Sequence, residues 1–152
     1  MSAADSIIVD LLVTAGRVTR LAGVISGDNL PRAMARALAV LDEHGAVRIS
    51  EFAMIDRCSQ PSATVLTGKL VAEGFASRRK DPADSRAVII ELTPAGHARL
   101  ARFRQALATE IGDRLPGFDT ERLTRLDTEL HDLLDAMKAA AGQHERAPRR
   151  EP

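Results

Sequence analysis

The chain has 152 residues, which is enough for one domain with a hydrophobic core. Hydrophobic residues make up 45 % and charged residues 28 % of it, and the formal net charge is zero, so the composition excludes a disordered chain and a uniformly basic protein. Aromatic residues make up only 3 %, which argues against recognition of single-stranded nucleic acid by stacking of bases on aromatic side chains.

The N-terminal third of the chain is predicted to form two helices. Residues 5–26 place an apolar side chain at every third or fourth position, which indicates an amphipathic helix. The polar stretch 26–29 interrupts this pattern. Pro31 then suits the first turn of a second helix, because a proline there loses no helical hydrogen bond, and Gly45 is expected to end that helix.

The next segment has the pattern of a helix-turn-helix. A short extended stretch at 46–49 precedes a third helix at 51–56, for which Ser50 is a suitable N-cap. A tight connection at 57–59 leads to a fourth helix at 60–73, which Gly74 ends. Two short helices joined by a turn of about three residues are typical of a helix-turn-helix.

After Gly74 the pattern changes from helical to extended. Residues 75–80 and 87–92 are predicted strands, the second rich in β-branched residues, and the polar stretch 81–86 is a predicted turn. This hairpin with a charged tip would be the wing of a winged helix-turn-helix.

Two more helices are expected beyond the hairpin. Thr93 suits the N-cap and Pro94 the first position of a long helix that would end at Pro116 and Gly117. Asp119 is a suitable N-cap for the last helix. The polar tail at 143–152 is predicted to be disordered.

The fold class is therefore predicted to be mainly α with a small β-hairpin wing. The lobe 30–93 can pack its own core, but a lobe of about 60 residues is too small to cover the long apolar stripes of segments 5–28 and 94–142. We interpret these two segments as the dimerisation layer of a homodimer. A closed monomeric bundle with a winged insert is the alternative.

Residues 59–75 and the segment after them resemble the MarR family of transcriptional regulators. Residues 59–70, followed by Glu73-Gly74-Phe75, look like that family's recognition helix. The combination Asp84-x-Arg86 followed by Leu92-Thr93-x-x-Gly96 is specific to the family at this spacing. The resemblance implies a dimeric, sequence-specific regulator of the repressor type, which binds an inverted repeat in double-stranded DNA.

The resemblance also implies which residues contact DNA. Gln60, Ser62 and Thr64 would contact bases and phosphates in the major groove, or would only cap and solvate the helix. Arg86 would enter the minor groove with Asp84 holding its guanidinium, or the two would form a plain surface ion pair. The remaining candidates are basic side chains that would lie near phosphates or be ordinary surface charges: Lys69, Arg78, Arg79 and Lys80.

Two positions depart from the family's pattern. Val65 stands where many members carry a basic residue, and Gly68 in the helix interior costs about 1 kcal/mol relative to alanine. Together with the zero net charge, they leave open a winged-helix protein-interaction module that has lost DNA binding. Residues 57–86 nevertheless carry six basic and three acidic residues, so a positive surface would be local.

Neither an enzyme nor a cofactor is expected. The four histidines lack the spacing of metal ligands, and no phosphate-binding glycine loop is present. Cys58 is the single cysteine, which excludes an intrachain disulfide and fits a packing role in a reducing compartment. Asp5 and Asp10 interrupt the first apolar stretch, so we expect a cytoplasmic protein with no membrane span.

A small-molecule effector is implied by the resemblance alone. Many members of the family bind a small anionic aromatic ligand between the dimerisation layer and the DNA-binding lobe. The resemblance is weakest in the flanking helices, so no residue of this chain is assigned to such a site.

Overall fold

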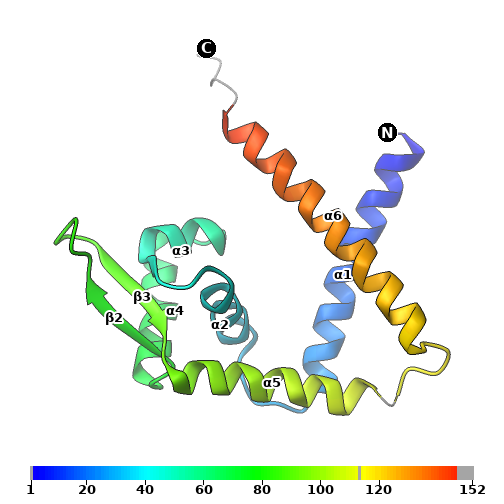
Figure 1. The fold of residues 1–152 in the computed structure, drawn as a ribbon, viewed down its shortest axis with the longest axis horizontal. Coiled ribbons are helices and arrows are strands. Elements are labelled where there is room, and N and C mark those ends of the chain that lie inside the picture. The colour runs from blue at the N-terminus through cyan, green and yellow to red at the C-terminus, as the bar shows by residue number, and fades with distance from the viewer. Residues whose placement is uncertain (1, 113, 147–152) are drawn as a thin grey trace. The chain divides into compact units, whose positions relative to one another are not determined.

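The computed structural model describes residues 2–112 and 114–146 and divides the chain into two units, residues 1–113 and 114–152. Figure 1 shows the elements. The first unit contains, in chain order, α1 (Ala3–Ile25), α2 (Arg32–His44), β1 (Val47–Arg48), α3 (Ile49–Ile55), α4 (Gln60–Ala72), β2 (Ala76–Lys80), β3 (Val88–Leu92) and α5 (Pro94–Gly112). The second contains α6 (Thr120–Arg146). The predicted fold class, mainly helical with a winged helix-turn-helix, is confirmed.

The predicted hairpin is part of a small antiparallel sheet with strand order β1-β3-β2. In the hairpin, Ala76 lies opposite Leu92 and Lys80 opposite Val88. On the other edge of β3, the short strand β1 places Arg48 opposite Ile89. The extended stretch predicted before α3 therefore becomes a third strand, and it attaches the wing to the helix-turn-helix.

The core of the first unit lies where α2, α3 and α4 meet β3. Leu38, Phe52, Leu70 and Ile90 are completely buried there. Thr67 of α4 is also buried, and its hydroxyl donates a hydrogen bond to the Ala63 carbonyl oxygen over 2.8 Å, so no polar atom of its side chain is left unpaired. This core holds α4 against the sheet and leaves its opposite face exposed.

Several helix ends differ from prediction, and Pro31 is the N-cap of α2 instead of a residue of its first turn. Ser50 lies inside α3 and is not its N-cap; Arg48 is, and its N–H donates to the Glu51 carboxylate over 2.8 Å, which makes a serine cap unnecessary. Helix α5 extends to Gly112, short of the predicted end at Pro116 and Gly117. Helix α6 continues past Gln143 to Arg146, a stretch without glycine or proline, and the rest of the predicted tail lies outside the described residues.

The first turn of α5 is fastened to the end of α4. As predicted, Thr93 caps α5: its hydroxyl accepts the Gly96 N–H over 3.1 Å and donates to the Gly74 carbonyl oxygen over 2.6 Å. A Cβ atom on Gly96 would lie 2.0 Å from the Phe75 carbonyl oxygen. Only glycine allows this close approach of two backbones, which sets the direction in which α5 leaves the lobe.

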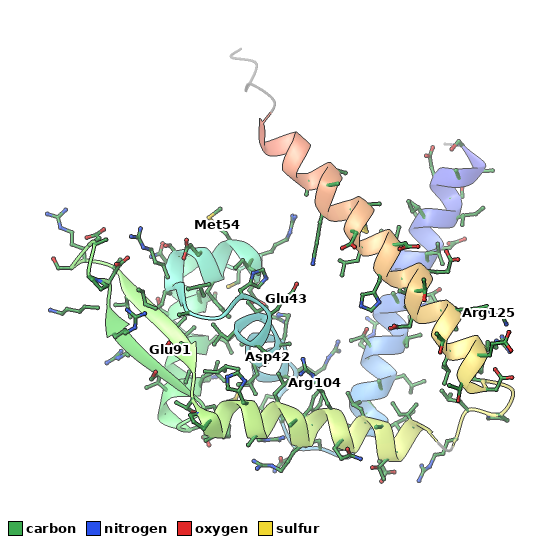
Figure 2. All side chains as sticks on the ribbon, in the orientation of Figure 1. Asp42, Glu43, Met54, Glu91, Arg104 and Arg125 are labelled. Carbon is green, nitrogen blue, oxygen red and sulfur yellow. The ribbon has the colours of Figure 1, made fainter. Side chains whose placement is uncertain are left out.

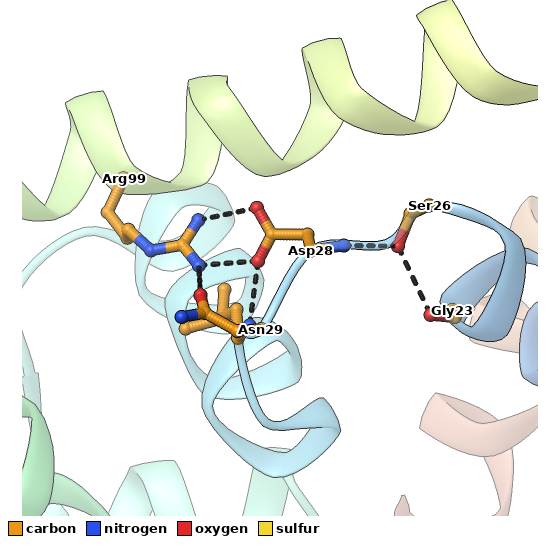
Figure 3. Close-up of polar contacts among 6 residues, drawn as sticks. Gly23, Ser26, Asp28, Asn29 and Arg99 are labelled. Atoms are coloured by element: carbon orange, nitrogen blue, oxygen red, sulfur yellow. Dashed lines mark hydrogen bonds and ion pairs between the residues drawn. The ribbon is translucent and has the colours of Figure 1, made fainter.

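A buried charge pair joins α5 to the α1–α2 connection (Figure 3). The Arg99 guanidinium donates two hydrogen bonds to the Asp28 carboxylate, one of them 3.0 Å long, and the two side chains are only 10 % and 12 % exposed. This guanidinium holds the pKa of Asp28 below its ordinary value. A second link runs from α5 to α2, where Arg104 donates to Asp42 over 3.0 Å (Figure 2).

The flanking helices expose the apolar stripes that the sequence predicts. No residue of α1 is buried within the described part of the chain, and Leu11 is 50 % exposed. In α6, which Asp119 caps as predicted, the exposed apolar side chains are Leu123, Leu126, Leu130, Leu134 and Met137. None of the described helices combines the length and apolar character needed to cross a membrane. The boundary between the two units falls inside the predicted layer 94–142, and the division into layer and lobe stays a prediction.

Candidate nucleic-acid interface

A groove of about 370 Å³ separates the start of α4 from the wing. Five of the predicted site residues line it: Gln60 and Thr64 of α4, Arg78 of β2, and Asp84 and Arg86 of the turn. Arg48 lines the same groove, although the sequence analysis did not select it. The two elements predicted to contact DNA, α4 and the wing, therefore line one concave surface.

The start of α4 is polar, and of its residues Gln60 and Thr64 line this groove. The Ser59 hydroxyl caps the helix by accepting the Ser62 N–H over 3.3 Å, and it also donates to the Ser62 hydroxyl over 2.8 Å. The Thr64 hydroxyl donates to the Gln60 carbonyl oxygen over 2.9 Å. Ser62 and Thr64 are therefore engaged within the helix. The exposed Gln60 amide makes no hydrogen bond to any described residue, so it is available to a ligand.

The wing tip corrects one prediction. The Asp84 carboxylate accepts the backbone N–H of Arg86 over 3.0 Å, and in the described chain it contacts no guanidinium, so neither the predicted clamp nor a plain ion pair is present. The reason is local, because an aspartate readily accepts the N–H two residues ahead and closes a turn. Asp84 therefore shapes the tip, and the Arg86 side chain stays exposed.

The pleat of the hairpin separates the predicted basic residues of β2. Arg78 lies opposite the buried Ile90, so it is on the face that looks toward the helices and the groove. Arg79 is on the opposite face, where its Nε lies 3.6 Å from the Glu91 carboxylate. Of the two neighbouring arginines, only Arg78 lines the groove. Lys80 is exposed at the end of the strand.

The MarR family matches residues 30–88, a segment that contains α2, the helix-turn-helix and the hairpin up to the start of β3. We refer to residues 30–88 as the MarR segment. The family prediction is thereby confirmed, and MarR family proteins are transcription regulators rather than enzymes.

Solved MarR structures resemble the chain beyond this segment. A MarR family protein from Bacillus stearothermophilus has a TM-score of 0.71 at 18 % identity, covering 91 % of this chain and 99 % of that one. The apo form of wild-type MarR from E. coli has a TM-score of 0.66 at 18 % identity, with coverages of 88 % and 98 %. At such identities the likeness establishes the fold.

A mutant MarR from E. coli complexed with operator DNA has a TM-score of 0.56 at 17 % identity, covering 82 % of this chain and 96 % of that one. Among curated proteins, none matches this sequence significantly.

Two predicted site residues of the MarR segment lie on the other flank of α4. Ser62 and Lys69 line a separate hollow of about 420 Å³. Asp56 and Arg36 also line it, and the Arg36 guanidinium donates two hydrogen bonds to the Asp56 carboxylate. Cys58 is half-buried there against the core. Burial and the Asp56 carboxylate raise the pKa of the Cys58 thiol, which favours its protonated form.

Arg48 and Asp81, which are not among the predicted site residues, join the helix-turn-helix of the MarR segment to its wing. The Arg48 guanidinium donates to the Asp81 carboxylate over 2.6 Å, and the same carboxylate accepts the Ala83 N–H over 2.8 Å. An aspartate at the start of a turn could have indicated the contact with the Ala83 N–H, but no sequence pattern indicates the contact with Arg48. The described residues contain no cluster of side chains that could hold a metal ion.

Proposed function

We propose that this protein is a dimeric, sequence-specific DNA-binding transcriptional regulator that acts as a repressor on an inverted repeat. The observation that carries this proposal is the groove between α4 and the wing. It combines an unpaired amide, Gln60, with two arginine side chains, Arg78 and Arg86, that make no hydrogen bond or ion pair within the described chain.

Each wall of this groove suits a different surface of a DNA duplex. The exposed face of α4 fits the major groove, where the Gln60 amide can pair with an adenine edge. The wing then reaches the adjacent minor groove, where Arg86 is attracted by the negative potential of a narrow A·T-rich segment. The related MarR complexed with operator DNA supports this assignment.

The dimer is proposed from the exposed apolar stripes of α1 and α6. A long apolar stripe on a helix is stable in water only when another element covers it. A second copy of the chain would supply those helices. A twofold dimer would then place its two α4 helices roughly 34–36 Å apart, which matches an inverted repeat with half-sites one helical turn apart.

A small anionic aromatic effector would relieve repression. A hollow of about 680 Å³ lies between α1, α2 and α5, with Leu100, Phe103 and Leu107 among its apolar lining. Three arginines also line it, of which Arg32 makes no hydrogen bond or ion pair within the described chain. An aromatic carboxylate would match this combination. Its binding would favour one spacing of the two lobes over another.

The test is a gel shift with the DNA upstream of the protein's own gene. We expect Arg86→Ala to weaken specific binding by roughly 5- to 150-fold, since it removes a minor-groove contact. The control is Arg79→Ala, which removes the same charge from the opposite face of the hairpin and should have little effect. Equal affinities of wild type and Arg86→Ala would refute the assigned role.

One observation favours a second function, a protein-interaction module. Val65 on α4 is 61 % exposed, and Met54 on α3 is 73 % exposed (Figure 2). Apolar side chains so placed suit a protein partner better than a phosphate backbone. The absence of any gel shift at micromolar protein and low salt would favour this function over the first.

A further inference from the structure

We propose that Arg48 and Asp81 are positioning residues that hold the wing at the angle to α4 which lets both elements contact one DNA duplex. This inference rests on the proposed function. It adds two residues that would orient the wing and would not themselves contact DNA bases. The two residues are 33 positions apart in sequence, but they lie on either side of the junction between the two elements.

The pair connects the start of one element to the base of the other. Arg48 ends β1 and is the N-cap of α3, so its backbone belongs to the helix-turn-helix. Asp81 directly follows β2 and begins the turn of the wing; its N–H donates to the Ala87 carbonyl oxygen over 3.0 Å. Two guanidinium nitrogens of Arg48, Nε and one terminal nitrogen, each lie 2.6 Å from the same Asp81 oxygen.

The link has one buried partner. The Asp81 side chain is 8 % exposed and its second oxygen accepts the Ala83 N–H over 2.8 Å, whereas the Arg48 side chain is 41 % exposed. The Ala83 N–H and the Arg48 guanidinium hold the pKa of Asp81 below its ordinary value, so the carboxylate is charged at neutral pH. A buried charge that loses its partner is costly, which ties the wing to Arg48.

The other ion pair of the hairpin provides a contrast. Arg79 and Glu91 are 49 % and 41 % exposed, and their closest atoms are 3.6 Å apart. Exposed pairs of this kind contribute little to stability. Glu91 (Figure 2) therefore provides a matched control for Asp81, because replacing either carboxylate by its amide removes one negative charge from the same hairpin.

Positioning and simple electrostatics predict opposite results for Asp81→Asn. The change makes the lobe more positive, so charge alone predicts tighter binding to any DNA. If the pair orients the wing, the same change lets the wing tilt away from α4, and Arg86 and Gln60 no longer reach adjacent grooves together. Specific binding then falls while non-specific binding holds or rises.

The experiment compares two duplexes of equal length at one salt concentration. One carries the upstream DNA that the wild type shifts, and the other carries the same bases in scrambled order. We expect Asp81→Asn to lower the ratio of the two affinities by about tenfold, with scrambled binding unchanged or stronger. Glu91→Gln should leave the ratio unchanged. Far-ultraviolet circular dichroism and thermal melting report whether each variant folds.

A second pair of variants keeps the proposal testable if Asp81→Asn does not fold. Arg48→Lys keeps the charge and one contact with Asp81, whereas Arg48→Gln removes the charge. We expect the ratio to fall for Arg48→Gln and to fall less for Arg48→Lys. An unchanged ratio in folded Asp81→Asn, or in both folded Arg48 variants, overturns the proposal. A wild type that does not distinguish the two duplexes refutes the proposed function instead.

Discussion

Buried contacts of single residues decide how the segments of this protein meet. Gly96 lies against the Phe75 backbone, Asp28 is held by Arg99, and Asp81 is held by Arg48. The residues directly before and after Gly96, Asp28 and Asp81 in sequence are exposed. Their roles follow from the partner that the fold brings to them, so a substitution at any of them should affect more than its own helix or strand.

Gly96→Ala should destabilise the protein by about 3 kcal/mol or more, because the added Cβ would overlap the Phe75 carbonyl oxygen 2.0 Å away and force the two backbones apart. Urea unfolding measures the loss. Gly68→Ala is the control, since no atom lies within 4 Å of its new Cβ, and it should stabilise by about 0.5–1 kcal/mol. Equal stability of the two variants would contradict the close packing at Gly96.

The Asp28–Arg99 pair should make stability depend on acid. The pKa of Asp28 is lowered in the folded state, so its contribution is complete above the unfolded value of about 3.9 and is lost as pH falls through the lower folded pKa. Asp28→Asn should cost about 3 kcal/mol at neutral pH, since it leaves the charge of Arg99 buried without a carboxylate partner. It should also flatten the dependence of unfolding free energy on pH below about pH 4.

The measurement for this pair is urea unfolding at a series of pH values. Glu121→Gln is a matched control, because Glu121 pairs with Arg125 on the surface of α6, where the two side chains are 83 % and 70 % exposed. It should leave both the stability and its pH dependence nearly unchanged. A wild-type curve no steeper than that of Asp28→Asn would argue against the lowered pKa.

Among the elements, α4 is the one whose proposed DNA contacts depend on the hydrogen bonds of its first turn. Its reading residues begin immediately after the cap, so the cap that stabilises the helix also orders the groups proposed to contact DNA. Helix α5 has a different task. Thr93 and Gly96 bind its first turn to the end of α4, so a shift of α5 would be passed directly to the proposed reading helix.

Ser59→Ala should cost about 1 kcal/mol of stability, because it removes the side-chain acceptor of the Ser62 N–H. Hydrogen exchange should be faster at the Ser62 amide, and specific DNA binding should weaken as the first turn of α4 frays. Ser59→Asp keeps an acceptor at the same position and should retain both properties. If Ser59→Asp lost as much as Ser59→Ala, the cap would not be the cause.

For the whole molecule, the apolar surface of α1 and α6 is the dominant feature. A chain that exposed these side chains in water would tend to associate, and the proposed dimer gives that association a defined form. The same dimer would supply the twofold symmetry that an inverted repeat requires, so assembly and DNA binding should be lost together.

Analytical ultracentrifugation should give a mass near twice the chain mass of 16.4 kDa. Leu11→Glu should lower that mass to a single chain and abolish specific DNA binding, since it places a charge in the apolar surface of α1. Met54→Glu is the control, because it charges an exposed apolar residue on α3 and should leave the dimer intact. A wild type with the mass of one chain would refute the dimer.

The order and kind of the elements, the position of the wing and most of the helix caps could be predicted from local sequence patterns. These features depend on residues within a few positions of one another: apolar periods of 3.6 or 2, a Thr-Pro helix start, and glycines at Gly45 and Gly74 with φ of 71° and 74°. Short-range hydrogen bonds and backbone sterics act in the same way wherever the segment is placed.

Which of the candidate residues share a surface became known from the folded arrangement of the chain. It put Arg78 in the groove and Arg79 outside it, turned Asp84 toward a backbone N–H, and gave Asp81 a partner 33 residues away in Arg48. The physical reason is that these outcomes depend on the direction of a side chain and on the burial of a charge. The direction of a side chain and the burial of a charge both depend on packing between distant segments, so a local sequence pattern does not predict them.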